Sequence, residues 1–239
     1  MADFPFCVIG DVEALTAQHR SGQAYSASTK PTAVQVADFM DRIAADLRAH
    51  CVSYGYDLDN LATSSNVAGA VTAGSAVEVA VTTGDGSNFS VGDEVFINGI
   101  KTGVRKYEFD YLTGVSTDTL TIATVDNNYD ASTITLYVMN DALRTLRDLN
   151  ALGAAAKALE AAYGSISPNA TDREDELWAR YYGSEENKYG LWAIEHVDSF
   201  LRGAARTDDA AERSTITSYG SENSTDTDVA PVFEKDMDF

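Results

Sequence analysis

The feature that most constrains this chain is a hydrophobic period that changes from helical to alternating and back to helical. Apolar residues follow helical spacing before about residue 67 and again from residue 142, whereas the stretch from Val67 to Val138 alternates apolar and polar side chains as strands do. Because the ends of a small β domain lie close together, such a domain can sit in a loop of another domain. We therefore predict a helical part that carries an inserted β domain.

The main helix before the β stretch is predicted to begin at Thr32, because Thr32 and Gln35 have the spacing of a capping box. A shorter helix is predicted further upstream, with Asp11 as its N-cap. The apolar side chains of the main helix fall on one face, which makes it amphipathic: Val36, Phe39, Met40, Ile43 and Leu47.

The β stretch is predicted to hold five or six short strands. Alternation is clearest around Val77–Val81, Val95–Ile97, Leu120–Ile122 and Ile134–Val138. Turns are predicted between the strands because Gly, Asn and Asp accept the backbone conformations that turns need. The predicted turns are Gly84-Asp85-Gly86, Asn98-Gly99, Thr113-Gly114 and Asp126-Asn127-Asn128. Short strands at this close spacing favour a small antiparallel barrel or sandwich.

Helical spacing returns after the β stretch in three segments. The first is predicted to be capped by Asn140 or Asp141 and to end at Gly164, and the second to begin with a capping box of Thr171 and Glu174. The third runs to Gly203, beyond which Ser, Thr, Asp and Glu prevail and a flexible arm is predicted. The resulting division is residues 1–62 and 140–203 for the helical part, 63–139 for the inserted β domain, and 204–239 for the arm.

The chain is strongly acidic, with 37 Asp and Glu residues against 17 Lys and Arg residues and a net charge of −20. Nucleic-acid phosphates would repel such a protein, which argues against a role in gripping or reading DNA but permits the lining of a channel through which DNA slides. Scarce lysine together with abundant Asp also fits a protein that works in concentrated salt, where screening removes self-repulsion. The sequence leaves both origins of the acidity open.

The residue patterns of common active sites are not found in this sequence. The histidines His19, His50 and His196 lack metal-ligand spacing, and there is no nucleophile elbow, Walker loop or dinucleotide fingerprint. Asp126 to Asp130 offers oxygen atoms for calcium but lacks the glycine and the distal glutamate of an EF-hand loop, so a solvated turn is favoured. Cys7 and Cys51 lie far apart and are interpreted as apolar filling. We expect no catalytic, cofactor or metal residues, and thus no enzyme.

Two groups of residues are candidates for binding other proteins. Aromatic side chains gather on the last helices and serve either the core or an oligomer interface, where Trp and Tyr concentrate binding energy. They are Trp178, Tyr181, Tyr182, Tyr189 and Trp192. Apolar side chains also reappear at the end of the predicted arm, which is the composition of a tethered docking peptide. They are Val232, Phe233, Met237 and Phe239.

Several of these motifs resemble the head–tail adaptor proteins of tailed viruses. The resemblance begins with Thr29-Lys30-Pro31-Thr32, the apolar helix that follows, and then Tyr54-Gly55-Tyr56. The small-residue run from Leu149 to Ala156 resembles a later helix of that family, and the Tyr-rich helix after it is similar too. The likeness covers about Asp11–Leu61 and Ala142–Gly203, and the β insertion departs from the family pattern.

The resemblance implies a helical bundle. Taking the bundle together with the β stretch and the predicted arm, we expect an α+β fold in which the bundle carries an inserted small antiparallel β barrel or sandwich and a flexible C-terminal arm. The resemblance further implies a ring, expected to be a dodecamer, in the neck of a virion that is assembled in the host cytoplasm. The ring would contact the portal protein and the next neck or tail-completion protein, DNA would pass through it without sequence-specific binding, and no membrane is involved. In that family the C-terminal arm reaches the portal, so Val232, Phe233, Met237 and Phe239 are the expected anchors.

A different class of function is also compatible with these patterns, namely a tail or baseplate binding module whose β domain recognises a ligand. In that case the helical part would be a scaffold for the β domain. The two hypotheses differ in particle size, because the connector forms closed rings whereas the module is a stable monomer that binds a ligand such as a glycan.

A halophilic origin of the acidity predicts that the melting temperature rises steeply from low salt to molar KCl or NaCl, because screening then relieves repulsion among the carboxylates. Thermal unfolding followed by circular dichroism over this range measures the effect. A melting temperature that does not change with salt would contradict it.

Overall fold

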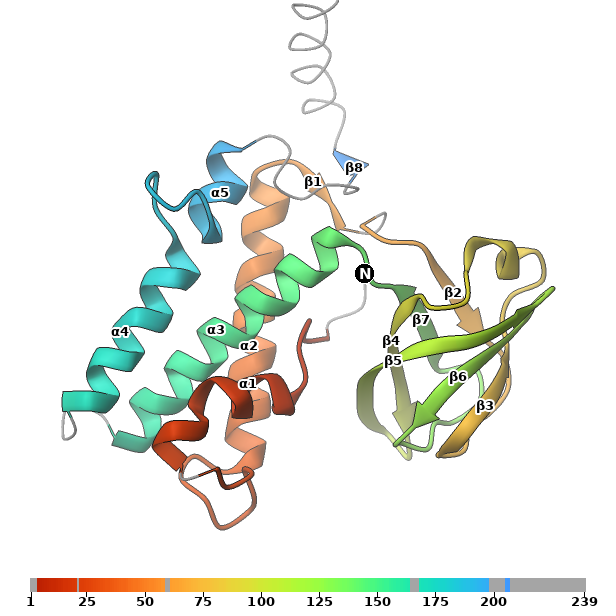
Figure 1. Cartoon of the computed structure of the whole chain (residues 1–239), viewed down its shortest axis with the longest axis horizontal. Helices are drawn as coiled ribbons and strands as arrows, with labels where there is room; N and C mark the ends of the chain where they lie inside the picture. The colour runs from red at the N-terminus through yellow and green to blue at the C-terminus, as the bar shows by residue number, and fades with distance from the viewer. Residues whose placement is uncertain (1–3, 21, 59–60, 164–167, 198–204, 207–239) are drawn as a thin grey trace, which may run out of the picture.

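The structure is a computed structural model that describes residues 4–20, 22–58, 61–163, 168–197 and 205–206. Helices gather at one end of the molecule and a curled sheet lies at the other (Figure 1). The helices are α1 (Ile9–Thr16), η1 (Ala17–Arg20), α2 (Ala33–Ser53), α3 (Asp141–Tyr163), α4 (Pro168–Tyr182) and α5 (Gly190–His196). None of the helices described here is long and apolar enough to cross a membrane.

The sheet contains six antiparallel strands in the order β2-β7-β4-β5-β6-β3. The strands are β2 (Ser64–Val67), β3 (Gly74–Ala80), β4 (Glu94–Lys101), β5 (Val104–Ser116), β6 (Thr119–Val125) and β7 (Ile134–Val138). A short 3₁₀ turn, η3 (Asp85–Asn88), lies between β3 and β4, and an isolated bridge joins Val67 to Val81 next to the two edge strands. A separate pair of two-residue strands joins β1 (Tyr56–Asp57) to β8 (Ala205–Arg206).

The predicted fold class, a helical bundle with an inserted barrel or sandwich, is wrong. The described residues form a mixed α/β protein with five α-helices and one six-stranded sheet curled into a half-barrel, and no helical bundle is evident. The physical reason lies in the core of the helical part, which the sheet helps to form. Phe96 of β4 is buried in that core, and Tyr107, Phe109 and Tyr137 from β5 and β7 pack against it. The helices therefore do not close around a core of their own.

The opposite face of the same sheet encloses a second core, which consists of aliphatic side chains with Phe89 and Tyr129. Strands β4 and β7 serve both cores, because successive side chains of a strand point to opposite faces. Ile97 and Leu136 point into this second core, while their neighbours Phe96 and Tyr137 point to the helices. The sheet is thus the layer that the two cores share.

Two of the predicted turns are wrong because their glycines serve close packing within strands. Asn98-Gly99 lies inside β4, where a β-carbon on Gly99 would come within 2.6 Å of the Tyr129 ring. Thr113-Gly114 lies inside β5, at a register shift opposite β6. Because Thr113-Gly114 does not end it, β5 is the longest of these strands, and the alternation pattern alone did not predict its length. The turns at Gly84-Asp85-Gly86 and Asp126-Asn127-Asn128 do connect strands, as predicted.

The predicted N-terminal caps are correct for α2 and α3 and wrong for α1 and α4. Thr32 and Gln35 form the predicted capping box of α2, and Asn140 Oδ1 accepts a hydrogen bond from Leu143 N at the start of α3. Asp11 lies inside α1, where its carboxylate accepts a hydrogen bond from Val8 N, so it is not the N-cap residue. Thr171 likewise lies inside α4, which begins at Pro168, because proline is well tolerated in the first turn of a helix.

A buried amide on α3 ties the N-terminal segment and α2 together. Asn150 is fully buried, and its Oδ1 accepts hydrogen bonds from Phe6 N at 2.7 Å and Cys7 N at 3.2 Å. Its Nδ2 donates to Met40 O at 2.9 Å. A buried backbone group without a partner is costly, so these bonds fix the path of the N-terminal segment across the helices.

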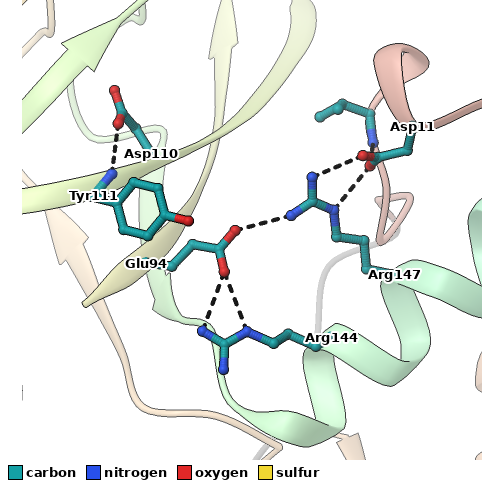
Figure 2. Close-up of polar contacts among 7 residues, drawn as sticks. Asp11, Glu94, Asp110, Tyr111, Arg144 and Arg147 are labelled. Carbon is teal, nitrogen blue, oxygen red and sulfur yellow. Dashed lines mark hydrogen bonds and ion pairs between the residues drawn. The ribbon is translucent and has the colours of Figure 1, made fainter. Parts of the chain in front are cut away.

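An ion-pair network joins the helices to the sheet, as Figure 2 shows. Arg147 of α3 donates to both carboxylate oxygens of Asp11 at 2.8 and 3.0 Å and to Glu94 Oε1 of β4 at 3.0 Å. Its guanidinium carbon lies 3.8 Å from the centre of the Phe109 ring on β5. Burial lowers the pKa of Arg147, but Asp11 and Glu94 outweigh burial and hold that pKa above its usual value. Arg144 reaches the other oxygen of Glu94 at 3.3 Å.

Replacing Arg147 with Met keeps an apolar stem on Phe109 but leaves two half-buried carboxylates without this partner. We expect R147M to lower the free energy of unfolding by about 2 kcal/mol, whereas the matched control R144M, at a side chain that is 50% exposed, should cost less than about 1 kcal/mol. Urea denaturation followed by tryptophan fluorescence and circular dichroism measures both losses. Equal losses in the two variants would show that Arg147 has no special role at the junction.

Candidate functional site

An open groove of about 670 Å³ lies between α2, α3, α4 and α5. A second hollow of about 450 Å³ continues along α2 and α3 and shares Ile43, Asp46, Lys157 and Glu160 with it. We call the first hollow the helical groove. Its lining residues are Ile43, Asp46, His50, Lys157, Glu160, Glu174, Trp178, Tyr181, Tyr182 and Leu191.

Helical spacing explains why these side chains meet. Glu174 and Trp178 are four residues apart on α4, and Lys157 and Glu160 are three apart on α3, so each pair shares a helix face. The floor depends on the close approach of α2 to α3 at Gly153, where an added β-carbon would lie 2.9 Å from Ile43 Cγ2. The groove is thus built from several helices whose faces converge.

The charge of the helical groove is mainly negative. Asp46, Glu160 and Glu174 line it against a single lysine, Lys157, whose Nζ lies 3.1 Å from Glu160 Oε2 and 5.4 Å from the centre of the Trp178 ring. Partial burial and then the nearby charge of Glu160 raise the pKa of Glu174, which shows that the carboxylates repel one another. A partner with positive charge would relieve this repulsion.

Three of the five predicted interface aromatics meet at the helical groove. Trp178 stacks on Tyr182 with ring centres 5.6 Å apart, and the Tyr181 ring meets both edge-on. Tyr181 is a core residue with 4% of its surface exposed, whereas Tyr182 is 56% exposed and Trp178 is half-buried. The core role is therefore confirmed for Tyr181, and the oligomer interface stays a prediction for the more exposed residues.

The other two aromatics lie away from the groove lining. Tyr189 precedes α5 and packs against the helical core, where burial raises its pKa to about 12. Trp192 stacks on His196 with ring centres 4.5 Å apart. The predicted arm residues Val232, Phe233, Met237 and Phe239 lie outside the described residues.

The candidate calcium loop uses its oxygens for hydrogen bonds within the protein. Asp130 accepts from Lys101 Nζ and from Thr102 N, and Asn128 Oδ1 accepts from Ala73 N. Within the described ranges no group of three or more metal-ligating side chains comes together. These contacts favour the turn over the calcium site.

Neither cysteine is placed for chemistry. Both are buried thiols, and burial raises the pKa of Cys7 well above its ordinary value and that of Cys51 to about 12. His50 points to the groove instead, with its Nε2 3.3 Å from Glu195 Oε1 of α5. The thiols therefore stay protonated and covered at neutral pH.

Sequence reasoning missed the acidic wall of the helical groove. Asp46 is on α2, Glu160 on α3 and Glu174 on α4, and only the packing of these helices brings the three together. Spacing along one helix gives no signal for such a set. What the groove can do chemically is hold a partner that combines positive charge with apolar surface.

No family model, curated protein or solved structure matches this chain.

Proposed function

We propose that this protein is a structural virion protein that assembles with copies of itself into a ring between the portal and the next neck protein. The observation that carries the proposal is the exposed aromatic surface on the helical groove, where Tyr182 is 56% exposed beside the half-buried Trp178. Exposed Tyr and Trp beside a groove are typical of protein interfaces. The resemblance of the Thr29–Thr32 and Leu149–Ala156 segments to head–tail adaptor proteins supports the same role.

The charge of the chain agrees with a conduit for DNA. A net charge of −20 repels phosphate, so DNA would slide past the ring without adhering to it. Such a protein acts by binding other copies of itself and the proteins above and below the ring, and the acidic groove contributes to this assembly.

A substitution of Tyr182 tests whether the protein assembles into a ring. We expect Y182A to weaken self-association about tenfold or more while the melting temperature stays within about 2 °C of the wild type, because the exposed ring contributes to an interface and little to the core. The matched control is Y181A, whose buried ring should cost about 3 kcal/mol of stability.

Mass photometry across a protein dilution series measures assembly, and negative-stain images identify closed rings. A wild-type protein that stays monomeric at every concentration, alone and with the portal, would contradict the proposal.

A deletion in the C-terminal segment tests the proposed contact with the portal. Deleting residues 230–239 removes Val232, Phe233, Met237 and Phe239, and should abolish association with the portal because a tethered apolar segment adds contacts at high effective concentration. Co-sedimentation with portal rings measures binding, and a variant in which the same residues are kept but 221–229 are deleted serves as the control. Unchanged portal binding after the first deletion would refute the role of the arm.

A further inference from the structure

The end of the β4–β5 hairpin carries an unusual concentration of positive charge for this chain. Residues 100–106, which we call the hairpin tip, include Lys101, Arg105 and Lys106, three of the 17 Lys and Arg residues in a chain of net charge −20. Two apolar side chains at the tip are exposed, Val104 by 58% and Ile100 by 36%. The tip thus combines cationic and apolar surface.

The hairpin tip is held in one shape by its own turn. Thr102 and Gly103 both have positive φ, at 52° and 77°, as in the two-residue turns that match the twist of a hairpin. Asp130 fixes the turn through Thr102 N and pairs with Lys101 at 2.9 Å, so it offsets one of the three positive charges. Arg105 lies near Asp41 of α2 in the same copy, where its positive charge works against the larger effect of burial, which raises the pKa of Asp41. Register places Lys101, Val104 and Lys106 on one face and Ile100 and Arg105 on the other. Both faces of the tip therefore carry a cation and an apolar side chain.

The hairpin tip and the helical groove have opposite charge and matching apolar content. The groove offers Asp46, Glu160 and Glu174 beside the rings of Trp178 and Tyr182. In Figure 1 α4 lies at one end of the molecule and the sheet at the other, with α2 and α3 between them. This placement permits the two surfaces of different copies of the chain to meet.

We propose that the hairpin tip of one copy docks in the helical groove of the next copy. Lys106 would face the carboxylates, and Val104, on the same face of the hairpin, would cover the exposed edge of Tyr182. Arg105, on the opposite face, would add to the positive charge of the tip. The contact is heterologous, since two different surfaces meet, and repeated contacts of this kind close into a ring when the rotation between copies permits. This inference rests on the proposed ring and names the surfaces that build it.

Charge favours the hairpin tip over the C-terminal segment as the occupant of the groove. Acidic residues outnumber basic ones in residues 207–239, so that segment would add negative charge to a groove that already holds repelling carboxylates. The hairpin tip brings the opposite charge. A second copy of the chain is therefore the occupant that the observations support.

Site-specific cross-linking tests the contact directly. A T102C variant is mixed with an E160C variant, whose side chain in the wild type is 53% exposed, and the mixture is treated with a short bismaleimide. The native thiols of Cys7 and Cys51 are buried and should not react. We expect a covalent dimer from the mixture and none from either variant alone. The matched control replaces E160C with D141C, at a side chain that is 73% exposed on the same helix but outside the groove, and should give no dimer.

Charge reversal supplies an independent measurement. We expect R105E/K106E and D46K/E160K each to weaken self-association at least about tenfold at moderate salt, because like charges then face each other. An equimolar mixture of the two variants should assemble again, since alternating copies restore opposite charges at every contact. Circular dichroism melting checks that both variants fold.

The outcomes separate this inference from the proposed function. Closed rings that give no cross-link and ignore both charge reversals would overturn docking of the hairpin tip while leaving the ring intact. Wild-type monomers at every concentration, without cross-links in the mixture, would overturn both.

Discussion

The contacts of the Arg147 guanidinium hold together the parts of the structure on which the rest depends. It joins the first turn of α1 through Asp11, the start of β4 through Glu94, and the ring of Phe109 on β5. Three residues further along α3, Asn150 binds the N-terminal segment and α2. Helix α3 therefore carries polar anchors for the sheet and for the helices on one continuous element, and both anchors are largely covered from water.

This arrangement places two different surfaces on elements that share a core. The sheet packs one face on the helices and encloses its own core with the other, so the β4–β5 hairpin extends from a layer that is held on both sides. The helical groove forms where α4 and α5 pack beside α2 and α3. Phe96 and Phe109 of the hairpin strands and Ile43 and Tyr181 of the groove all contribute to the same helical core, which connects the two surfaces.

Sequence patterns predicted the elements better than their assembly. The capping box at Thr32 and the alternation around Val77–Val81 depend on neighbours in the chain, and both were correct. The turns assigned to Gly99 and Gly114 were wrong because a glycine that allows a turn and a glycine that allows close packing look alike until the facing residue, Tyr129 or Thr121, is known. For the site, the gathering of Trp178 and Tyr182 on the last helices was visible in the sequence, but Asp46 and Glu160 join them only through packing between helices.

The hydrogen side chain of Gly153 acts as a spacer for a site that it does not line. It lets α3 lie against Ile43 on α2, and Ile43 is part of the groove floor. A methyl group there would come within 2.9 Å of the Ile43 side chain, so that side chain or the two helices would have to shift. The shape of the groove lining therefore depends on a buried position that bears no charge and contacts no partner of the groove.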